Sequence, residues 1–413
     1  MTNALRTLLD TRDWLLADGA TGTNLFNMGL EAGEAPEMWN VQQPENITKL
    51  YQSAVDAGSD IFLTNTFGGN ASRLKLHNAV DQVHELNRIG ASIGRDVADA
   101  AGRPVFVAGS VGPTGEILSP MGTLTHEIAV EMFHEQAEGL KAGGVDVLWV
   151  ETISAPEEFA AAAEAFALAG MDWCGTMSFD TAGRTMMGLT SKDMAKMVAK
   201  LAHQPIGYGA NCGVGASDLL RTILAMSEVD DKSVLISKGN AGIPKYHDGH
   251  IHYDGTPELM AKYAVLARHA GAKIIGGCCG TMPEHLVAMR AALEASEAGP
   301  RPSLEQIAEE MGGFSSESDG TDGAGPAASP RPNAPGPRSP ARRHHALPLS
   351  ARPCHERCRR GNSHASASAP PHHRREDRQS PPPVRHGQAG DVRRSAGSRP
   401  RRCNCQSGNC VFR

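Results

Sequence analysis

The chain has 413 residues, with 46 acidic and 40 basic side chains and a formal net charge of −6 at pH 7. This composition is typical of a globular protein, and no apolar run is long enough to span a membrane. Charges at Arg6, Asp10 and Arg12 interrupt the start of the chain, so a signal peptide is not expected there. We expect a cytoplasmic protein whose thiols stay reduced.

Eight short apolar runs recur along the first three hundred residues, each followed by a helical stretch. They are WLLADGA (14–20), DIFLTNTFG (60–68), PVFVAGSVGP (104–113), DVLWVETI (146–153), DWCGTMSF (172–179), PIGYGANCG (205–213), SVLISKGNAG (233–242) and KIIGGCCG (273–280). Between them lie amphipathic segments such as 46–58 and 257–271, which end in Ala-Gly as helices often do. Apolar strands that alternate with helices indicate a parallel sheet covered on both faces. Eight such units in about 300 residues predict a (β/α)8 TIM barrel, with a doubly wound open sheet as the alternative.

The composition changes at about Phe314. Residues 314–413 are rich in Arg, Pro, Ser, Ala, Gly and His, and the last lysine of the chain is Lys273. Too few large apolar side chains remain to offset the entropy of ordering, so we predict a barrel domain over residues 1–313 and a disordered tail over 314–413. The arginine-only tail also resembles a GC-rich coding sequence translated out of frame. Because the tail is basic, the rest of the chain is distinctly acidic, which argues against a nucleic-acid partner.

Small and polar residues gather where the apolar runs stop. They are Asp18-Gly19, Asn65-Thr66, Gly109-Ser110, Glu151-Thr152, Asn211-Cys212, Asn240 and Cys278-Cys279. The C-terminal ends of the strands of a TIM barrel form one rim that carries the active site, so we expect these residues to converge there. Each also has a structural alternative, since Asn and Gly are common turn formers.

Three of the rim residues are cysteines. Cys212 ends the sixth run, and Cys278 and Cys279 end the eighth, so their thiols should meet across one intervening strand. Three thiolates can bind zinc and leave one tetrahedral position open, as catalytic sites do, and they favour zinc over magnesium. The alternatives are a buried cluster of free thiols and a vicinal redox disulfide. Cys174 lies within the fifth run, where we expect a packing role.

These motifs resemble the homocysteine S-methyltransferase family. GANCG (209–213) and GGCCGT (276–281) are similar to its zinc signature, and LADGATGT, TNTFG, GPTGE and WVETI match along the first four units. The resemblance covers about residues 10–300. It implies a (β/α)8 barrel that binds zinc through the three cysteines and methylates homocysteine to methionine. A homocysteine thiol with a pKa of about 8.5 is mostly protonated at neutral pH, and zinc coordination makes it the nucleophilic thiolate.

The resemblance also implies a site for the amino end of homocysteine. Asp18, the backbone at Gly19 and Ala20, and Glu151 would form this site. Helix capping by Asp18 and an ion pair at the barrel mouth for Glu151 are the structural alternatives.

The sequence motifs leave several methyl donors open. No cobalamin- or folate-binding domain is expected after the barrel, so a small donor or a separate protein must supply the methyl group. Betaine is the first expectation, because APEMWN (35–40) places Trp39 in the loop after the first barrel unit, where its ring can hold a quaternary ammonium by cation–π attraction. Packing is the alternative role of Trp39. Asn240 is a second candidate donor-binding residue, although GNAGIP (239–244) resembles the methionine-synthase module more than the animal betaine enzymes. S-methylmethionine, dimethylsulfoniopropionate and a separate corrinoid protein are the alternatives.

Three histidines follow the seventh run. His247, His250 and His252 can either bind a second metal or line the barrel mouth. The oligomeric state does not follow from the sequence.

Overall fold

The computed structural model describes residues 3–243, 245–247 and 250–320, with side chains described except at 245–252. The segment predicted to be a disordered tail lies outside the described residues from position 321 onward. Among the helices that are described, none has the length and apolar character needed to cross a membrane.

Eight parallel strands form a barrel. They are β1 (Leu15–Leu16), β2 (Ile61–Leu63), β3 (Phe106–Val111), β4 (Val147–Ile153), β5 (Trp173–Met177), β6 (Gly207–Cys212), β7 (Val234–Gly239) and β10 (Ala272–Gly277). Their spatial order is β1-β10-β7-β6-β5-β4-β3-β2, and every neighbouring pair is parallel. Each strand coincides with one of the eight apolar runs, so the predicted TIM barrel is confirmed and the open-sheet alternative is wrong.

The barrel closes between its two shortest strands, β1 and β2. An isolated parallel bridge joins Ala17 to Ile61. The Asp18 carboxylate adds a side-chain acceptor to this closure, because Leu63 N donates to Asp18 Oδ2 at 2.8 Å. Asp18 is therefore part of the barrel wall as well as of its rim.

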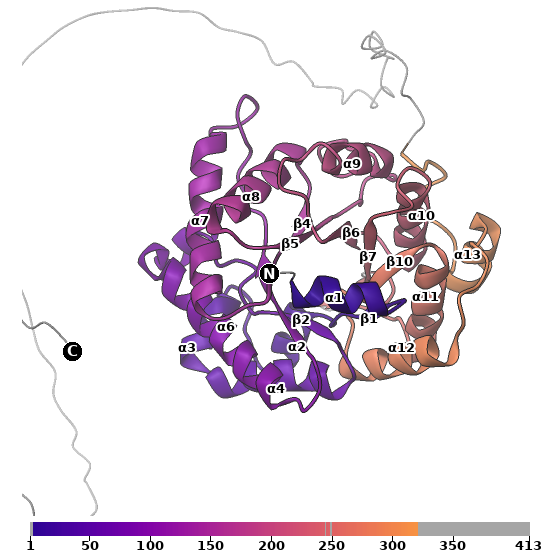
Figure 1. Ribbon diagram of the computed structural model, residues 1–413, viewed down its shortest axis with the longest axis horizontal. Coiled ribbons are helices and arrows are strands. Elements are labelled where there is room, and N and C mark those ends of the chain that lie inside the picture. The colour runs from indigo at the N-terminus through magenta and orange to yellow at the C-terminus, as the bar shows by residue number, and fades with distance from the viewer. Residues whose placement is uncertain (1–2, 244, 248–249, 321–413) are drawn as a thin grey trace, which may run out of the picture. The chain divides into compact units, whose positions relative to one another are not determined.

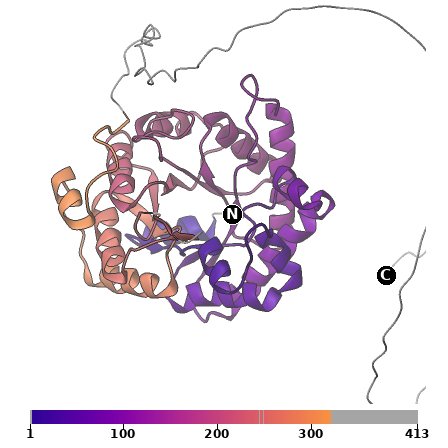
Figure 2. The ribbon, with the colours of Figure 1, turned by 180° about the vertical axis from the view of Figure 1, so that it is seen from behind.

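The helices lie around the strands, most of them in a ring that Figures 1 and 2 show from opposite sides. They are α1 (Ala4–Thr11), α2 (Thr21–Asn27), α3 (Trp39–Gln42), α4 (Pro44–Asp56), α5 (Ala71–Leu74), α6 (Val83–Ala100), α7 (His126–Ala142), α8 (Pro156–Ala169), α9 (Ser191–Val198), α10 (Ala216–Ser227), α11 (Pro257–His269), α12 (Pro283–Ala295) and α13 (Leu304–Met311). The helices α4 and α11 were predicted from their amphipathic pattern. Gly58 and Gly271, just beyond their ends, adopt the positive φ angles of 96° and 106° that a helix stop favours.

Apolar side chains form two layers, one inside the barrel and one between strands and helices. The inner layer includes Trp149 and Cys174, both fully buried, so the packing role expected for Cys174 agrees with its position. Leu5 and Leu9 of α1 join this inner layer, and Figure 1 shows α1 lying across the middle of the ring. Helix α1 thus covers one end of the barrel and leaves the other for the site.

A short antiparallel hairpin follows β7. Its strands are β8 (Lys245–His247) and β9 (His250–His252), paired so that His247 faces His250. The sequence analysis did not predict it. The side chains of the three histidines lie outside the described part of the chain, and so does their possible role as metal ligands.

Residues 312–320 continue the fold beyond the predicted boundary at 313. The Arg221 guanidinium on α10 lies over the Phe314 ring, 4.5 Å from its centroid, and donates to Ser316 O at 2.9 Å. Ser315 N donates to Asp218 Oδ2 at 3.0 Å. The described fold therefore extends to residue 320, because this segment is attached to α10.

Candidate functional site

A cavity of about 360 Å³ lies at the carboxyl ends of the strands. Its wall includes Asp18, Gly19 and Ala20 after β1, Glu151 on β4, Cys212 on β6, Lys238 on β7 and Cys278 and Cys279 after β10. Much of the rim predicted to carry the active site thus lines one cavity at the strand ends. The predicted rim residues that do not line it are Thr66, Gly109, Ser110, Asn211 and Asn240.

The three rim thiols come together at one side of this cavity. Cys212 is the last residue of β6, and Cys278 and Cys279 directly follow β10; β7 lies between these two strands. The sulfur atoms of Cys212 and Cys279 are 3.8 Å apart, and all three sulfurs lie within 4.8 Å of one another. Within the described residues this is the one group of three or more His, Cys, Asp or Glu side chains spaced to hold a metal ion.

Unusual backbone conformations position these thiols. Cys212 has φ of 61° and Thr152 has φ of 62°, both in the left-handed region that non-glycine residues rarely adopt. Asn211, which precedes Cys212, holds Thr152 in place, because its Oδ1 accepts from Thr152 N at 2.9 Å and its Nδ2 donates to Thr152 Oγ1 at 2.7 Å. The same amide nitrogen is 3.7 Å from Cys278 Sγ. Asn211 therefore links β4, β6 and the thiol cluster.

The thiol cluster has the electrostatics of a site built for a cation. Hydrogen bonding to Cys278, together with burial, raises the pKa of the Cys212 thiol to about 12. Hydrogen bonding to Cys212, together with burial, raises the pKa of Cys279 to about 11. Three half-buried thiols this close together cannot all ionise without a positive charge between them. A soft divalent cation supplies that charge, so the donor set fits zinc with one coordination position left open.

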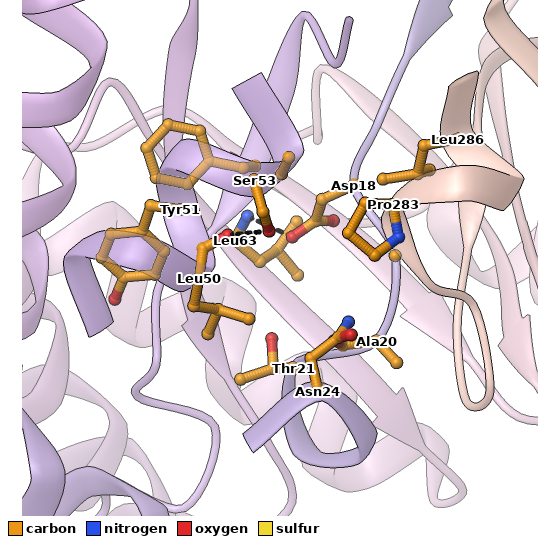
Figure 3. Close-up of a pocket in the computed structure, with 13 residues that line it drawn as sticks. Asp18, Ala20, Thr21, Asn24, Leu50, Tyr51, Ser53, Leu63, Pro283 and Leu286 are labelled. Carbon is orange, nitrogen blue, oxygen red and sulfur yellow. Dashed lines mark hydrogen bonds between the residues drawn. The ribbon is translucent and has the colours of Figure 1, made fainter. Parts of the chain in front are cut away.

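A buried ion pair lies beside the thiols. Lys238 Nζ is 2.5 Å from Asp18 Oδ1, and the two side chains are only 2% and 8% exposed. The other Asp18 oxygen accepts from Leu63 N, and Figure 3 shows the carboxylate turned toward Leu63. Burial opposes the charge of Lys238, but Asp18 and Glu151 outweigh it and raise the pKa of Lys238. Lys238 is therefore a fixed ammonium in the cavity wall.

Glu151 completes this charged group. Its Oε1 accepts from Ser110 Oγ at 2.5 Å. Burial raises the pKa of Glu151, and the Lys238 charge acts in the opposite direction. Asp18 and Glu151 were predicted from the sequence motifs, whereas Lys238 was not. The available signal was a lysine inside the apolar run SVLISKG, one residue before the end of its strand.

Gly19 and Ala20 line the cavity, but the fold already uses much of their backbone. Ala20 N donates to Thr281 O at 3.1 Å, and Ala20 O accepts from Asn24 Nδ2. A Cβ at Gly19 would lie 2.6 Å from Thr281 O, so only glycine allows this close approach. The loop after β1 is thus held against the loop after β10.

Trp39 does not lie where the sequence analysis placed it. It is the first residue of α3 rather than part of a loop, it is 2% exposed, and it packs in the layer between strands and helices. It is absent from the cavity wall, so the structure favours its packing role over a cation–π role. Phe67 is the aromatic residue among those that line the cavity.

Asn240 is also absent from the cavity wall. Its Nδ2 donates to Gly213 O at 2.9 Å, next to Cys212. Its Oδ1 is buried and has no hydrogen-bond partner within the described residues. Asn240 therefore supports the turn that carries the Cys212 thiol.

Comparisons with known proteins agree with this architecture. Residues 15–293 match the model of the homocysteine S-methyltransferase family. The oxidised form of the homocysteine methyltransferase MmuM from Escherichia coli is similar in structure, with a TM-score of 0.60 and 24% identity over 70% of this chain and 99% of that chain. Its metallated form has a TM-score of 0.59 and 23% identity over the same shares. At this identity the likeness to MmuM shows the shared fold.

Proposed function

Because the chain belongs to the homocysteine S-methyltransferase family, we propose that it is a zinc-dependent enzyme that methylates the thiol of homocysteine with a small donor, first of all betaine, to give methionine. The convergence of Cys212, Cys278 and Cys279 on one cavity wall carries the proposal. Zinc held by these thiolates would bind the homocysteine sulfur in its open position and keep that sulfur deprotonated at neutral pH. Thiol ligands that must stay reduced favour a cytoplasmic location.

The charged group beside the thiols matches the amino-acid end of homocysteine. Asp18 and Glu151 offer carboxylates to its α-ammonium, and Lys238 offers an ammonium to its α-carboxylate. All three side chains line the cavity wall together with the thiols, so the amino acid would lie along one side with its sulfur at Cys212, Cys278 and Cys279. Binding at these fixed charges orients the sulfur before the reaction.

The proposed methyl transfer is a single displacement. A lone pair of the homocysteine sulfur attacks a methyl carbon of betaine, a carbon–sulfur bond forms, and the carbon–nitrogen bond breaks with its electrons on nitrogen. The products are methionine and dimethylglycine, which leaves as a neutral tertiary amine without needing a proton. The cationic donor suits a cavity with more acidic than basic side chains in its wall.

A reconstituted assay tests this proposal. Purified protein loaded with zinc is given homocysteine and, in parallel, betaine, dimethylsulfoniopropionate, S-methylmethionine or a methylated corrinoid protein. We expect methionine from betaine without any corrinoid or folate, in proportion to bound zinc. If methionine formation needs the corrinoid protein, the chain is a homocysteine-binding subunit instead. If the methyl group is transferred only from a sulfonium donor, that compound and not betaine is the donor.

A further inference from the structure

The cavity has a second charged region, which the proposed binding of homocysteine leaves unused. It is formed by Glu34, Glu37, Phe67, Arg73, Leu76 and His77, and we name it the outer subsite. These residues follow β1 and β2 in the chain. In the strand order of the barrel, β2 lies opposite β6, which carries Cys212. The outer subsite therefore faces the thiols across the cavity mouth.

Arg73 is the unusual member of the outer subsite. No hydrogen bond or ion pair joins its guanidinium to any other described residue, although its backbone N–H caps α5 through Asn70. Every other arginine of residues 3–320 has a partner for its guanidinium in the described part of the chain. The Arg73 side chain is exposed at the cavity mouth, so its guanidinium is solvated there and offers two parallel donors to a carboxylate.

Glu37 places a carboxyl group in the outer subsite. The side chain is 4% exposed, and its Oε1 accepts from Gly68 N at 2.6 Å. Burial raises the pKa of Glu37, while the nearby charges of Arg73 and His77 act against that rise. A buried carboxylate and a free guanidinium in one wall are complementary to a molecule that carries both a cation and a carboxylate.

We infer that Arg73 binds the carboxylate of the methyl donor and so selects zwitterionic methylonium compounds, an inference that rests on the proposed function. Two substrates of that reaction each carry a carboxylate, and two cations other than histidine line the cavity. Lys238 lies beside Asp18, where the proposed function places the α-carboxylate of homocysteine. Arg73 is left for the second carboxylate, with the onium group of the donor between Glu37 and the thiols.

Matched donors and matched variants test this inference. The donors are betaine and betaine amide, which differ in one charged group, and dimethylsulfoniopropionate with its amide. The variants are Arg73→Met, Arg73→Lys and the control Lys75→Met, which removes a nearby exposed charge outside the cavity wall. Steady-state kinetics on the zinc-loaded full chain gives kcat/KM for each donor and KM for homocysteine.

We expect the wild type to prefer each acid over its amide by at least about tenfold, the usual effect of one charge-assisted pairing. Arg73→Met should lower kcat/KM for the acids by about the same factor and remove the preference, with KM for homocysteine unchanged. Arg73→Lys should restore part of the preference, and Lys75→Met should behave as wild type.

Three results would overturn the inference. One is an equal loss with acids and amides in Arg73→Met, which would indicate a structural role. Another is a rise in KM for homocysteine instead of for the donor. The third is a protein that binds homocysteine but transfers no methyl group from any small donor. In that case the homocysteine site is intact and the inference about the donor fails. Failure to bind homocysteine at all would instead refute the proposed function.

Discussion

Replacing Lys238 by methionine should destabilise the barrel substantially. Methionine keeps the length and apolar stem of lysine but removes the ammonium that is 2.5 Å from Asp18 Oδ1. Asp18 cannot move away to water, because its other oxygen accepts from Leu63 N across the closure between β1 and β2. The variant would therefore hold the Asp18 and Glu151 carboxylates in a buried site without their cation.

The expected cost follows from the burial of the pair. Removing one partner of a buried ion pair typically costs about 3–5 kcal/mol, because the other charge remains uncompensated. For a folded region of this size, that cost corresponds to a fall in Tm of roughly 5–8 °C. Calorimetry at neutral pH on metal-free wild type and variant measures it. The double variant Asp18→Asn with Lys238→Met removes both charges and should recover a good part of the loss.

The loss of stability in the Lys238→Met variant should depend on pH. Burial already raises the pKa of Glu151 and the Lys238 charge acts against that rise, so loss of Lys238 should move this pKa further above its unfolded value of about 4. Folding then favours the protonated forms, so the deficit is present at neutral pH and shrinks as pH falls toward about 4. A variant that melts within about 1 °C of wild type, or whose deficit grows in acid, would refute the assignment of Lys238 as the counter-charge.

The remaining predictions concern the metal site and the end of the fold. Replacing any one of the three rim cysteines by alanine, Cys278→Ala for example, should abolish zinc retention and methyl transfer while circular dichroism shows the barrel intact. Cys174→Ala should keep a full equivalent of zinc and cost only about 1 kcal/mol, so similar metal contents in the two variants would contradict the assignment. Zinc should be released with uptake of protons as pH falls, because each thiolate ligand competes with a proton; metal retention independent of pH would exclude thiolate ligation. A chain ending at residue 320 should keep its metal and its Tm, whereas one ending at 311 should melt lower because the contacts of Phe314 and its neighbours with α10 are lost; equal Tm values would show that residues 312–320 do not contribute.

Local pattern and chain order are enough to predict the barrel and the meeting of the thiols. Eight apolar runs alternate with helices, and right-handed crossovers place consecutive parallel strands side by side. The end of the sixth strand and the end of the eighth then had to flank the seventh, which put Cys212 beside Cys278 and Cys279. Cys174 was predicted to pack because it stands inside a run, and the structure buries it completely. These inferences succeeded because local pattern and chain order decide them.

Which side chains face the cavity depends on how distant segments pack in the folded chain. Trp39 is buried because α3 is covered by its neighbours, and no local pattern contains that information. Lys238 lies in an apolar run, yet the alternation of a strand turns it toward Asp18, 220 positions away in the chain. Arg73 matters because its guanidinium has no partner among the described residues, a property that only the positions of those residues reveal. Charge pairing across a barrel depends on distances between distant segments, and the folded chain alone sets those distances.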